Sequence, residues 1–417
     1  MKSVKTFYLT PPFYMITKPH ISPSFSYIPL EETLEIIPRK QRLFIGIPKE
    51  SSFQENRVPL TPESVSILIQ NGHDVVVEHN AGEHSFYFDN DFSEVGARIV
   101  YEKAEVYKAE MIIKSAPISE EEIELLQPNQ VIISPIHLPF LKASMVEALM
   151  KKKIIGITFD SIKDDSGIYP IVRSMSEIAG SSAILTAAKY LGNVHNGKGI
   201  LLGGISGVPP AKVVIIGAGV VGEFAARTAL GLGATIKVFD NSIYRLMRLQ
   251  NNLGRRVFTS VIDPKELGEE LKNADVAVGA LKPVNGITPV VVSEEMVSHM
   301  KSGSIVVDVS IDRGGCFETS RATSHEHPTF KKYDVIHYCV PNIASGVSRT
   351  ASRAISNVLM PIVLECADMG GVEHLLKTKP GIRNGVYLYK GCVTNAPIAR
   401  RFDIKFTDLN LLMANPI

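Results

Sequence analysis

Two series of short apolar runs alternate along this chain with longer segments that have the spacing of amphipathic helices. The runs of the first series are residues 43–47, 73–78, 111–113, 131–134 and 154–158. The runs of the second series are residues 212–216, 235–239, 276–280, 304–309 and 335–338. Because strands alternate with helices, each series predicts a parallel sheet covered by helices on both faces.

The order of these patterns predicts an α/β protein with two doubly wound parallel-sheet domains. Residues 1–41 have weak periodicity and several prolines and are interpreted as an N-terminal extension. Residues 42–170 are expected to form a Rossmann-like substrate domain, completed by residues 349–417, because the segment after Val347 reads as a returning helix. Residues 171–348 are expected to form an inserted Rossmann domain, with the ligand cleft between the two domains.

Composition narrows the class of protein. Of the 417 residues, 45% are hydrophobic and 21% charged, which is typical of a soluble globular protein. A net charge of +1 gives no basic footprint for nucleic acid or an anionic membrane, and no apolar run reaches the roughly 20 residues of a membrane span. The N-terminus lacks a signal-peptide pattern, and the four separated cysteines indicate free thiols in the cytoplasm and no metal site.

The most informative segment is Gly217-Ala-Gly219-Val220-Val221-Gly222, which directly follows an apolar strand run and opens an Ala-rich helix. In this pattern the first glycine permits the turn, the second lets a pyrophosphate approach the backbone, and the third lets helix and strand pack closely. A glycine-rich turn that binds nothing is the plain alternative.

An acidic residue strengthens the nucleotide interpretation. Asp240 ends the next strand, where a carboxylate can bind the ribose 2′-hydroxyl and repel a 2′-phosphate. NAD is therefore favoured over NADP, although the nearby cation Arg245 weakens that preference.

Several further stretches fall where loops should meet the cleft. They are Ile45-Gly-Ile-Pro-Lys-Glu, Glu55-Asn-Arg57-Val-Pro-Leu-Thr-Pro, Pro135-Ile-His137-Leu, Met175-Ser176-Glu-Ile-Ala-Gly, Asp308-Val-Ser-Ile-Asp312-Arg-Gly-Gly-Cys-Phe-Glu and His337-Tyr-Cys-Val-Pro-Asn342. Together they resemble the alanine dehydrogenase and transhydrogenase alpha-subunit family, collinearly from about Leu43 to the C-terminus. His137 and the run that contains Asp312 resemble the alanine dehydrogenase branch.

The resemblance implies a role for individual residues. Arg57 matches the arginine that binds the substrate carboxylate, a task suited to a guanidinium. His137 matches the histidine that moves protons, and Asp312 matches an aspartate that shares this work beside the nicotinamide. Residues expected to contact the cofactor are Ser176, Gly217, Gly219, Val220, Val221, Gly222, Asp240, Arg245, Leu281 and Asn342. The family usually forms hexamers, so a homo-oligomer is expected.

One position departs from the family pattern. The family has two lysines, as Lys-Val-Lys-Glu-Pro, and the second helps to grip pyruvate. Here the strand reads Ile113-Lys114-Ser115-Ala116-Pro117, so alanine stands at the second lysine. Either Lys114 binds the substrate after a register change, or Arg57 holds it alone, or the substrate differs from alanine.

Plainer interpretations compete at each site residue. Taken singly, Arg57 is more often a surface arginine, His137 a satisfied strand-end histidine, and Asp312 a cap for the following glycine turn. The pattern as a whole favours reversible NAD-dependent oxidative deamination of L-alanine to pyruvate and ammonium.

Three other functions stay open. One is the hydride-transfer subunit of a transhydrogenase. Another is reductive amination of a larger oxo acid, as in opine- or saccharopine-forming enzymes. The third is a non-catalytic NAD-binding protein whose substrate site has decayed.

Overall fold

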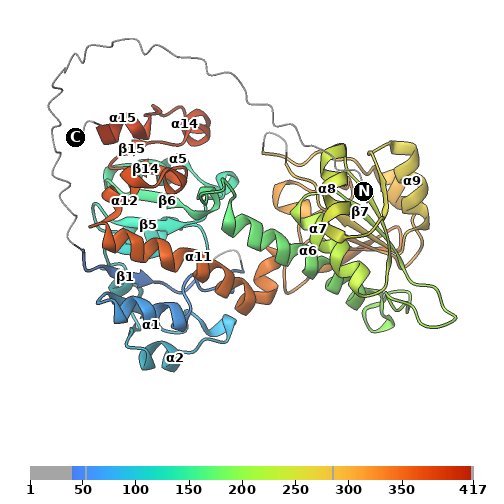
Figure 1. Cartoon of the computed structure of the whole chain (residues 1–417), viewed down its shortest axis with the longest axis horizontal. Helices are drawn as coiled ribbons and strands as arrows, with labels where there is room; N and C mark the ends of the chain where they lie inside the picture. Colours follow the sequence, from blue (N-terminus) through green and yellow to red (C-terminus); the bar gives the residue numbers. More distant parts are fainter. Residues whose placement is uncertain (1–39, 52–53, 284–285, 415–417) are drawn as a thin grey trace, which may run out of the picture. The chain divides into compact units, whose positions relative to one another are not determined.

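The computed structural model describes residues 40–51, 54–283 and 286–414. The predicted N-terminal extension lies almost entirely outside the described residues. Within the described part of the chain the strands form two sheets, one of eight strands and one of seven. Figure 1 shows helices on both faces of these sheets, as the alternating pattern predicts.

The first sheet has the strand order β15-β14-β6-β5-β4-β1-β2-β3. Its strands are β1 (Phe44–Ile47), β2 (Asp74–Glu78), β3 (Arg98–Val100), β4 (Met111–Ile113), β5 (Val131–Ser134), β6 (Ile155–Thr158), β14 (Val386–Tyr389) and β15 (Cys392–Val393). The helices of this half are α1 (Pro62–Gln70), α2 (Asp89–Glu94), α3 (Lys103–Val106), α4 (Glu120–Leu125), α5 (Ala143–Lys151), α11 (Ser348–Asp368), α12 (Val372–Thr378), α13 (Pro380–Arg383), α14 (Ala396–Phe402) and α15 (Leu409–Ala414).

The second sheet has the order β12-β13-β11-β10-β7-β8-β9. Its strands are β7 (Lys212–Ile216), β8 (Thr235–Phe239), β9 (Phe258–Ser260), β10 (Val276–Gly279), β11 (Ile305–Asp308), β12 (Thr329–Lys332) and β13 (Val335–Tyr338). Its helices are α7 (Val220–Gly231), α8 (Ile243–Leu253), α9 (Pro264–Asn273) and α10 (Glu294–Ser298), and α6 (Pro170–Leu191) precedes the sheet in the chain.

The two doubly wound α/β sheets confirm the predicted fold class, but the sheets are not wholly parallel. The edge strand β12 runs antiparallel to β13, and β14 runs antiparallel to both β6 and β15. The edge strand β12 has the mixed sequence Thr-Phe-Lys-Lys, which gives no apolar run to detect. β14 lies between β6 and β15 and carries the buried run Val-Tyr-Leu-Tyr, which was not assigned to a strand from the sequence.

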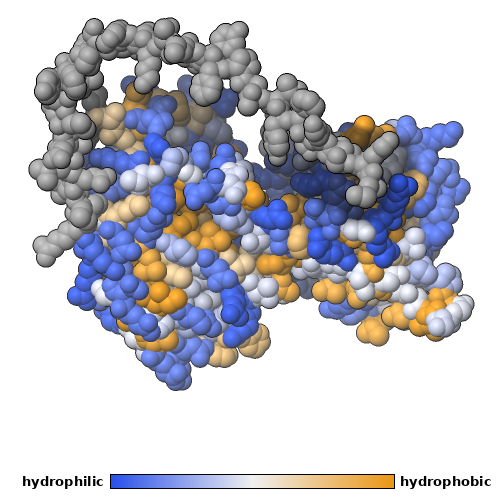
Figure 2. Space-filling view, in the orientation of Figure 1, coloured by the Kyte–Doolittle hydropathy of each residue, from blue (hydrophilic) through white to orange (hydrophobic). Residues whose placement is uncertain are grey.

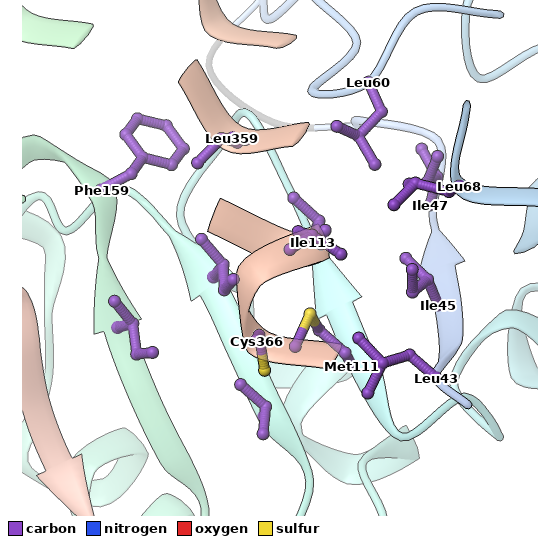
Figure 3. Packing of buried hydrophobic residues seen from close by; sticks show 14 of the residues in the cluster. Leu43, Ile45, Ile47, Leu60, Leu68, Met111, Ile113, Phe159, Leu359 and Cys366 are labelled. Carbon is purple, nitrogen blue, oxygen red and sulfur yellow. The ribbon is translucent and has the colours of Figure 1, made fainter. Parts of the chain in front are cut away.

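Buried apolar side chains cover both faces of each sheet, because successive residues of a strand point to opposite faces. On one face of the first sheet, Ile45 and Ile113 pack with Leu68 of α1 and with Leu359 and Cys366 of α11 (Figure 3). Helix α11 therefore belongs to the core of the first sheet, although it follows the second sheet in sequence.

Helix α6 contacts elements of both halves. At Gly180 an added Cβ would lie only 2.3 Å from the carbonyl oxygen of Val221, so glycine allows α6 and α7 to pack closely. Near its N-terminus, Met175 contacts the first half through Arg57. These contacts connect the helix that follows the first sheet to the glycine-rich turn of the second.

Two further observations bear on the sequence predictions. None of the four cysteines, all of them in described segments, forms a disulfide. Within the ranges that the structure describes, no single helix has the length and apolar character of a membrane span. The bent pair Ile343–Asp368 and Val372–Thr378 meets that test by length and composition alone.

Candidate functional site

Arg57 lies in the loop after β1, which ends at the switch point of the first sheet between β1 and β4. Glu55 of the same loop accepts a hydrogen bond from Nε of Arg57 at 2.6 Å and another from its Nη2. Nη1 of Arg57 lies 3.1 Å from Sδ of Met175. Burial acts to lower the pKa of Arg57, but the charge and hydrogen bonds of Glu55 and the charges of Asp160 and Glu50 together outweigh it, and the pKa is raised. Arg57 is therefore a fixed, permanently charged cation.

Serine hydroxyls around the start of α11 hold the loop that carries Arg57. Three backbone N–H groups of this loop donate to them, Asn56 to Ser345 (2.9 Å), Val58 to Ser352 (2.9 Å) and Thr61 to Ser356 (3.0 Å). Because a buried N–H without an acceptor is costly, this row of hydroxyls fixes the path of the loop. The C-terminal part of the chain thus positions a residue near its beginning.

His137 follows β5 and precedes a short 3-10 helix, Leu138–Phe140. Its ring is partly buried and lies near that of Phe140, with the ring centroids 6.3 Å apart. Burial lowers the pKa of His137 below its ordinary value of 6.5; the charge of Asp312 opposes this change, and those of Arg313 and Arg57 add to it. A histidine that stays neutral near pH 7 is suited to accept a proton.

Asp312 lies in a 3-10 helix, Val309–Arg313, directly after β11 of the second sheet. Its Oδ1 accepts the backbone N–H of Asn342 at 2.9 Å. Desolvation raises the pKa of Asp312, while this N–H and the charges of His137, Arg313 and Arg57 lower it. Asp312 and His137 thus influence each other's protonation although they come from different sheets.

Asn342 connects Asp312 to the arginine loop. Its backbone has φ 55° and ψ 43°, a left-handed conformation that asparagine adopts more readily than most residues. While its N–H binds Asp312, its side-chain Nδ2 donates to Oε2 of Glu55 at 3.0 Å. Hydrogen bonds therefore run from Asp312 through Asn342 and Glu55 to Arg57.

The structure places the side chain of Lys114 between two buried carboxylates. Its Nζ lies 2.7 Å from Glu50 and 2.9 Å from Glu122, and its side chain is only 1% exposed. Glu50 also accepts the backbone N–H groups of Ser115 and Ala116. Lys114 is thus occupied by two buried carboxylates, and its hydrogen bonds are to those groups rather than to the chain of bonds around Arg57.

The glycine-rich turn has the geometry that its sequence predicts. Gly217 has φ +113°, and a Cβ there would lie 2.3 Å from the carbonyl oxygen of Ala280. A Cβ on Gly222 would lie 1.8 Å from the carbonyl oxygen of Gly217, whereas one on Gly219 would meet nothing within 4 Å. The second glycine thus borders open space at the start of α7, whose first N–H groups have no acceptors within the helix. Such a turn fits a pyrophosphate.

Asp240 lies directly after β8, beside this turn. Its two oxygens accept the N–H groups of Ala218 (2.8 Å) and Ser242 (2.7 Å), and Nη1 of Arg245 lies 3.7 Å from it. Asp240 therefore fixes the glycine turn as well as offering a carboxylate beside it.

Three other expected cofactor positions lie on nearby elements. Ser176 is in α6, next to Met175, and its hydroxyl donates to the carbonyl of Val172. Leu281 follows β10, the neighbour of β7, and its N–H donates to Ser310. Val220 and Val221 form the first turn of α7.

Sequence reasoning missed four charged residues of this region. Glu55 holds Arg57 and Asn342, and Asp308 accepts N–H groups of Ser310 and Cys316 in the loop that carries Asp312. Asp160 follows β6, and burial raises its pKa to about 6 against the opposing charges of Arg57 and Arg313. An acid or base directly after a predicted strand was the available signal for Asp160 and Arg313.

Comparison with known proteins bears on what such a site does. Residues 46–179 match the family model described as "Alanine dehydrogenase/PNT, N-terminal domain", and residues 183–396 match its C-terminal domain. Alanine dehydrogenase 2 of Staphylococcus aureus strain USA300 is 38% identical over 363 residues, covering 87% of this chain and 97% of that protein. The homologue in strain Mu50 matches to the same extent.

Solved structures agree with this pattern. A structure of an L-alanine dehydrogenase superposes with a TM-score of 0.81 at 34% identity, covering 86% of this chain and 99% of that one. A transhydrogenase from Sinorhizobium meliloti has a TM-score of 0.71 at 24% identity, with 85% of this chain and 99% of the other covered. The second likeness concerns the fold alone.

Proposed function

This chain belongs to the alanine dehydrogenase/PNT family, and on that premise we propose that it catalyses the reversible oxidative deamination of L-alanine with NAD. The products are pyruvate, ammonium, NADH and a proton, and one water is consumed. The observation that carries this proposal is the hydrogen-bonded chain Asp312–Asn342–Glu55–Arg57. It joins a carboxylate-binding cation to an acidic group at the carboxyl end of a nucleotide-fold strand.

Arg57 is assigned to the substrate carboxylate. Two of its nitrogens bind Glu55, so the guanidinium is held in one orientation before the substrate arrives. Fixing the carboxylate fixes the direction of the Cα–H bond, and such orientation effects account for a large part of enzymatic rate enhancement. When bound, the nicotinamide ring accepts the hydride that leaves Cα.

His137 and Asp312 are assigned to proton transfer. After hydride loss the substrate is an imine, water adds to its carbon, and the resulting carbinolamine expels ammonia. His137, kept neutral by burial, accepts the proton from the attacking water and returns it to the leaving nitrogen. The acidic Asp312 acts on the same ring through its charge and favours the protonated form as it develops.

NAD is proposed over NADP because Asp240 presents a carboxylate beside the glycine turn. A 2′-phosphate next to this buried acid would be repelled, and the 2′-hydroxyl of NAD can donate to it. Arg245, at 3.7 Å, reduces that repulsion only in part. The ratio of kcat/KM for NAD and NADP measures this preference directly, and a ratio in favour of NADP contradicts it.

A homo-oligomer is also proposed, with the hexamer that the family resemblance implies. The loop after α6 exposes the apolar side chains Leu201, Ile205 and Val208. In Figure 2 apolar side chains (orange) gather at the tip of this loop, which is yellow-green in Figure 1. Light scattering tests the proposal. The mass of the particle should be several times the 45.6 kDa of one chain, six times for the hexamer, and the mass of a single chain would contradict the proposal.

The test of the activity is the change in NADH absorbance with L-alanine and NAD, and in reverse with pyruvate, ammonium and NADH. A panel of other amino and oxo acids accompanies it. Turnover of alanine supports the proposal. Turnover of a larger oxo acid alone, or cofactor binding without any turnover, contradicts it.

A further inference from the structure

Arg57 by itself is a weak site for an anion because Glu55 already compensates its charge. Glu55 binds both Nε and Nη2 of the guanidinium and is almost fully buried, with its side chain 2% exposed. Asp160 and Asp312 add two further carboxyl groups whose charges interact with Arg57. A substrate carboxylate beside Arg57 therefore meets a neutral ion pair and two acidic neighbours, and it needs another cation.

Lys114 does not provide that cation. It is enclosed by Glu50 and Glu122, with nitrogen–oxygen distances of 2.7 and 2.9 Å. Moving its ammonium to a substrate would leave two buried carboxylates without their cation, which is strongly unfavourable. The lysine is more stable where it is.

Arg313 lies next to the site in the chain and in space. It directly follows Asp312, whose carboxylate is linked through Asn342 to Glu55 and hence to Arg57. The N–H of Thr288 donates to the carbonyl oxygen of Arg313 at 2.8 Å, so its backbone is fixed. Its charge acts on Asp312, on His137 and on Asp160, which come from three different strand ends.

The side chain of Arg313 is available for a ligand. It is partly exposed, and among residues 40–51, 54–283 and 286–414 its guanidinium forms neither a hydrogen bond nor an ion pair. Arg57 and Lys114, by contrast, are both held by short contacts to carboxylates. A guanidinium without such a partner, near a carboxylate-binding site, can form the paired N–H···O contacts that arginine makes with carboxylates.

We propose that Arg313 is the second cation of the substrate site and binds the carboxylate of the amino or oxo acid together with Arg57. This role rests on the alanine dehydrogenase function proposed above. In the family pattern one arginine and one lysine bind the carboxylate. In this site two arginines do so, one from a loop of each sheet. Substrate binding therefore links the loop after β1 to the loop after β11.

The test compares wild-type enzyme with Arg313→Gln, Arg313→Lys and the control Arg255→Gln. Arg255 is an exposed arginine near the end of α8, so its loss changes the net charge equally. KM for pyruvate, KM for ammonium and Kd for NADH are measured for each. Arg313→Gln should raise KM for pyruvate on the order of tenfold or more and leave Kd for NADH unchanged, and Arg313→Lys should recover part of the loss.

The pH profile gives a second readout that a purely structural role would not change. Since the charge of Arg313 lowers the pKa of His137, its removal should move the acid limb of kcat/KM toward higher pH. An unchanged KM for pyruvate in Arg313→Gln overturns the proposal. So does an equal rise in KM in Arg255→Gln.

Failure of the proposed function can be distinguished from failure of the role given to Arg313. If the wild-type protein turns over no amino or oxo acid, the activity assignment fails. The binding of pyruvate to the protein–NADH complex, measured by calorimetry, then tests Arg313 alone. Binding that Arg313→Gln weakens supports the inference, and equal binding by both proteins overturns it. Should Arg313→Gln lower the melting temperature, Arg313→Lys carries the same comparison, with a raised KM for pyruvate as the expected result.

Discussion

The side-chain amide of Asn342 donates to Glu55 at 3.0 Å, across 287 positions of sequence. The two residues come from loops of different sheets, and each holds a further site residue, Asp312 in one case and Arg57 in the other. This contact, together with the serine hydroxyls that hold the Arg57 loop, therefore sets the relative position of Arg57 and Asp312.

Replacement of Asn342 tests that dependence. Asp and Gly both tolerate its left-handed backbone, with φ 55°, so neither should strain the loop. Asn342→Asp places a second carboxylate against Glu55 and should raise KM for pyruvate strongly. Asn342→Gly removes only the hydrogen bond and should have a smaller effect. Equal KM values in the two variants would contradict the role given to the contact.

Two glycines of the nucleotide turn should respond oppositely to alanine. In Gly219→Ala the methyl group enters open space, so the melting temperature should stay near wild type while Kd for NADH rises. In Gly222→Ala the methyl group would lie 1.8 Å from the carbonyl oxygen of Gly217, so the helix must shift and stability should fall. Thermal melts and NADH titrations of both variants measure this contrast. If Gly219→Ala binds NADH as tightly as the wild-type protein, the pyrophosphate does not bind at this turn.

Asp160 should make stability depend on pH. Its pKa is raised from 3.8 to about 6 by burial, so the fold favours its protonated form. The stabilisation is fully present below the unfolded pKa and is lost as pH rises through the folded pKa. Asp160→Asn, which stays neutral, should therefore melt higher than wild type at about pH 7 and nearly equal to it at about pH 4. A difference that does not vary with pH would show that Asp160 is ionised throughout.

His137 should set the acid limb of the pH profile. Its pKa lies below 6.5 because of burial, so kcat/KM for alanine should fall only as pH drops below that value. His137→Asn keeps a polar side chain but cannot transfer protons, and it should lose on the order of a hundredfold or more in kcat. If His137→Asn keeps the same acid limb of kcat/KM, a group other than His137 titrates there.

Local patterns in the sequence predicted the fold and the tight glycine-rich turn because both depend on neighbouring residues. The apolar runs became β1, β7 and the other central strands, and Gly217 and Gly222 occupy positions where a side chain would collide with the backbone. The antiparallel strands β12 and β14 were missed, and their direction is set by the partners with which they pair.

The substrate site was less accessible to sequence reasoning. Arg57, His137 and Asp312 were expected from the family resemblance, and in the structure their charges influence one another's pKa. The bond between Glu55 and Asn342 joins residues 287 positions apart, which no spacing in the chain displays. The place of Arg313 after a predicted strand did not show which residues its charge reaches. Lys114 illustrates the same limit: its two carboxylate partners, Glu50 and Glu122, are 64 and 8 positions away.

The most direct test is NADH formation by the purified protein with L-alanine and NAD, beside the variant His137→Ala. We expect turnover by the wild-type protein that collapses in His137→Ala, while NADH binding is retained. NAD binding without any formation of NADH from L-alanine would contradict it.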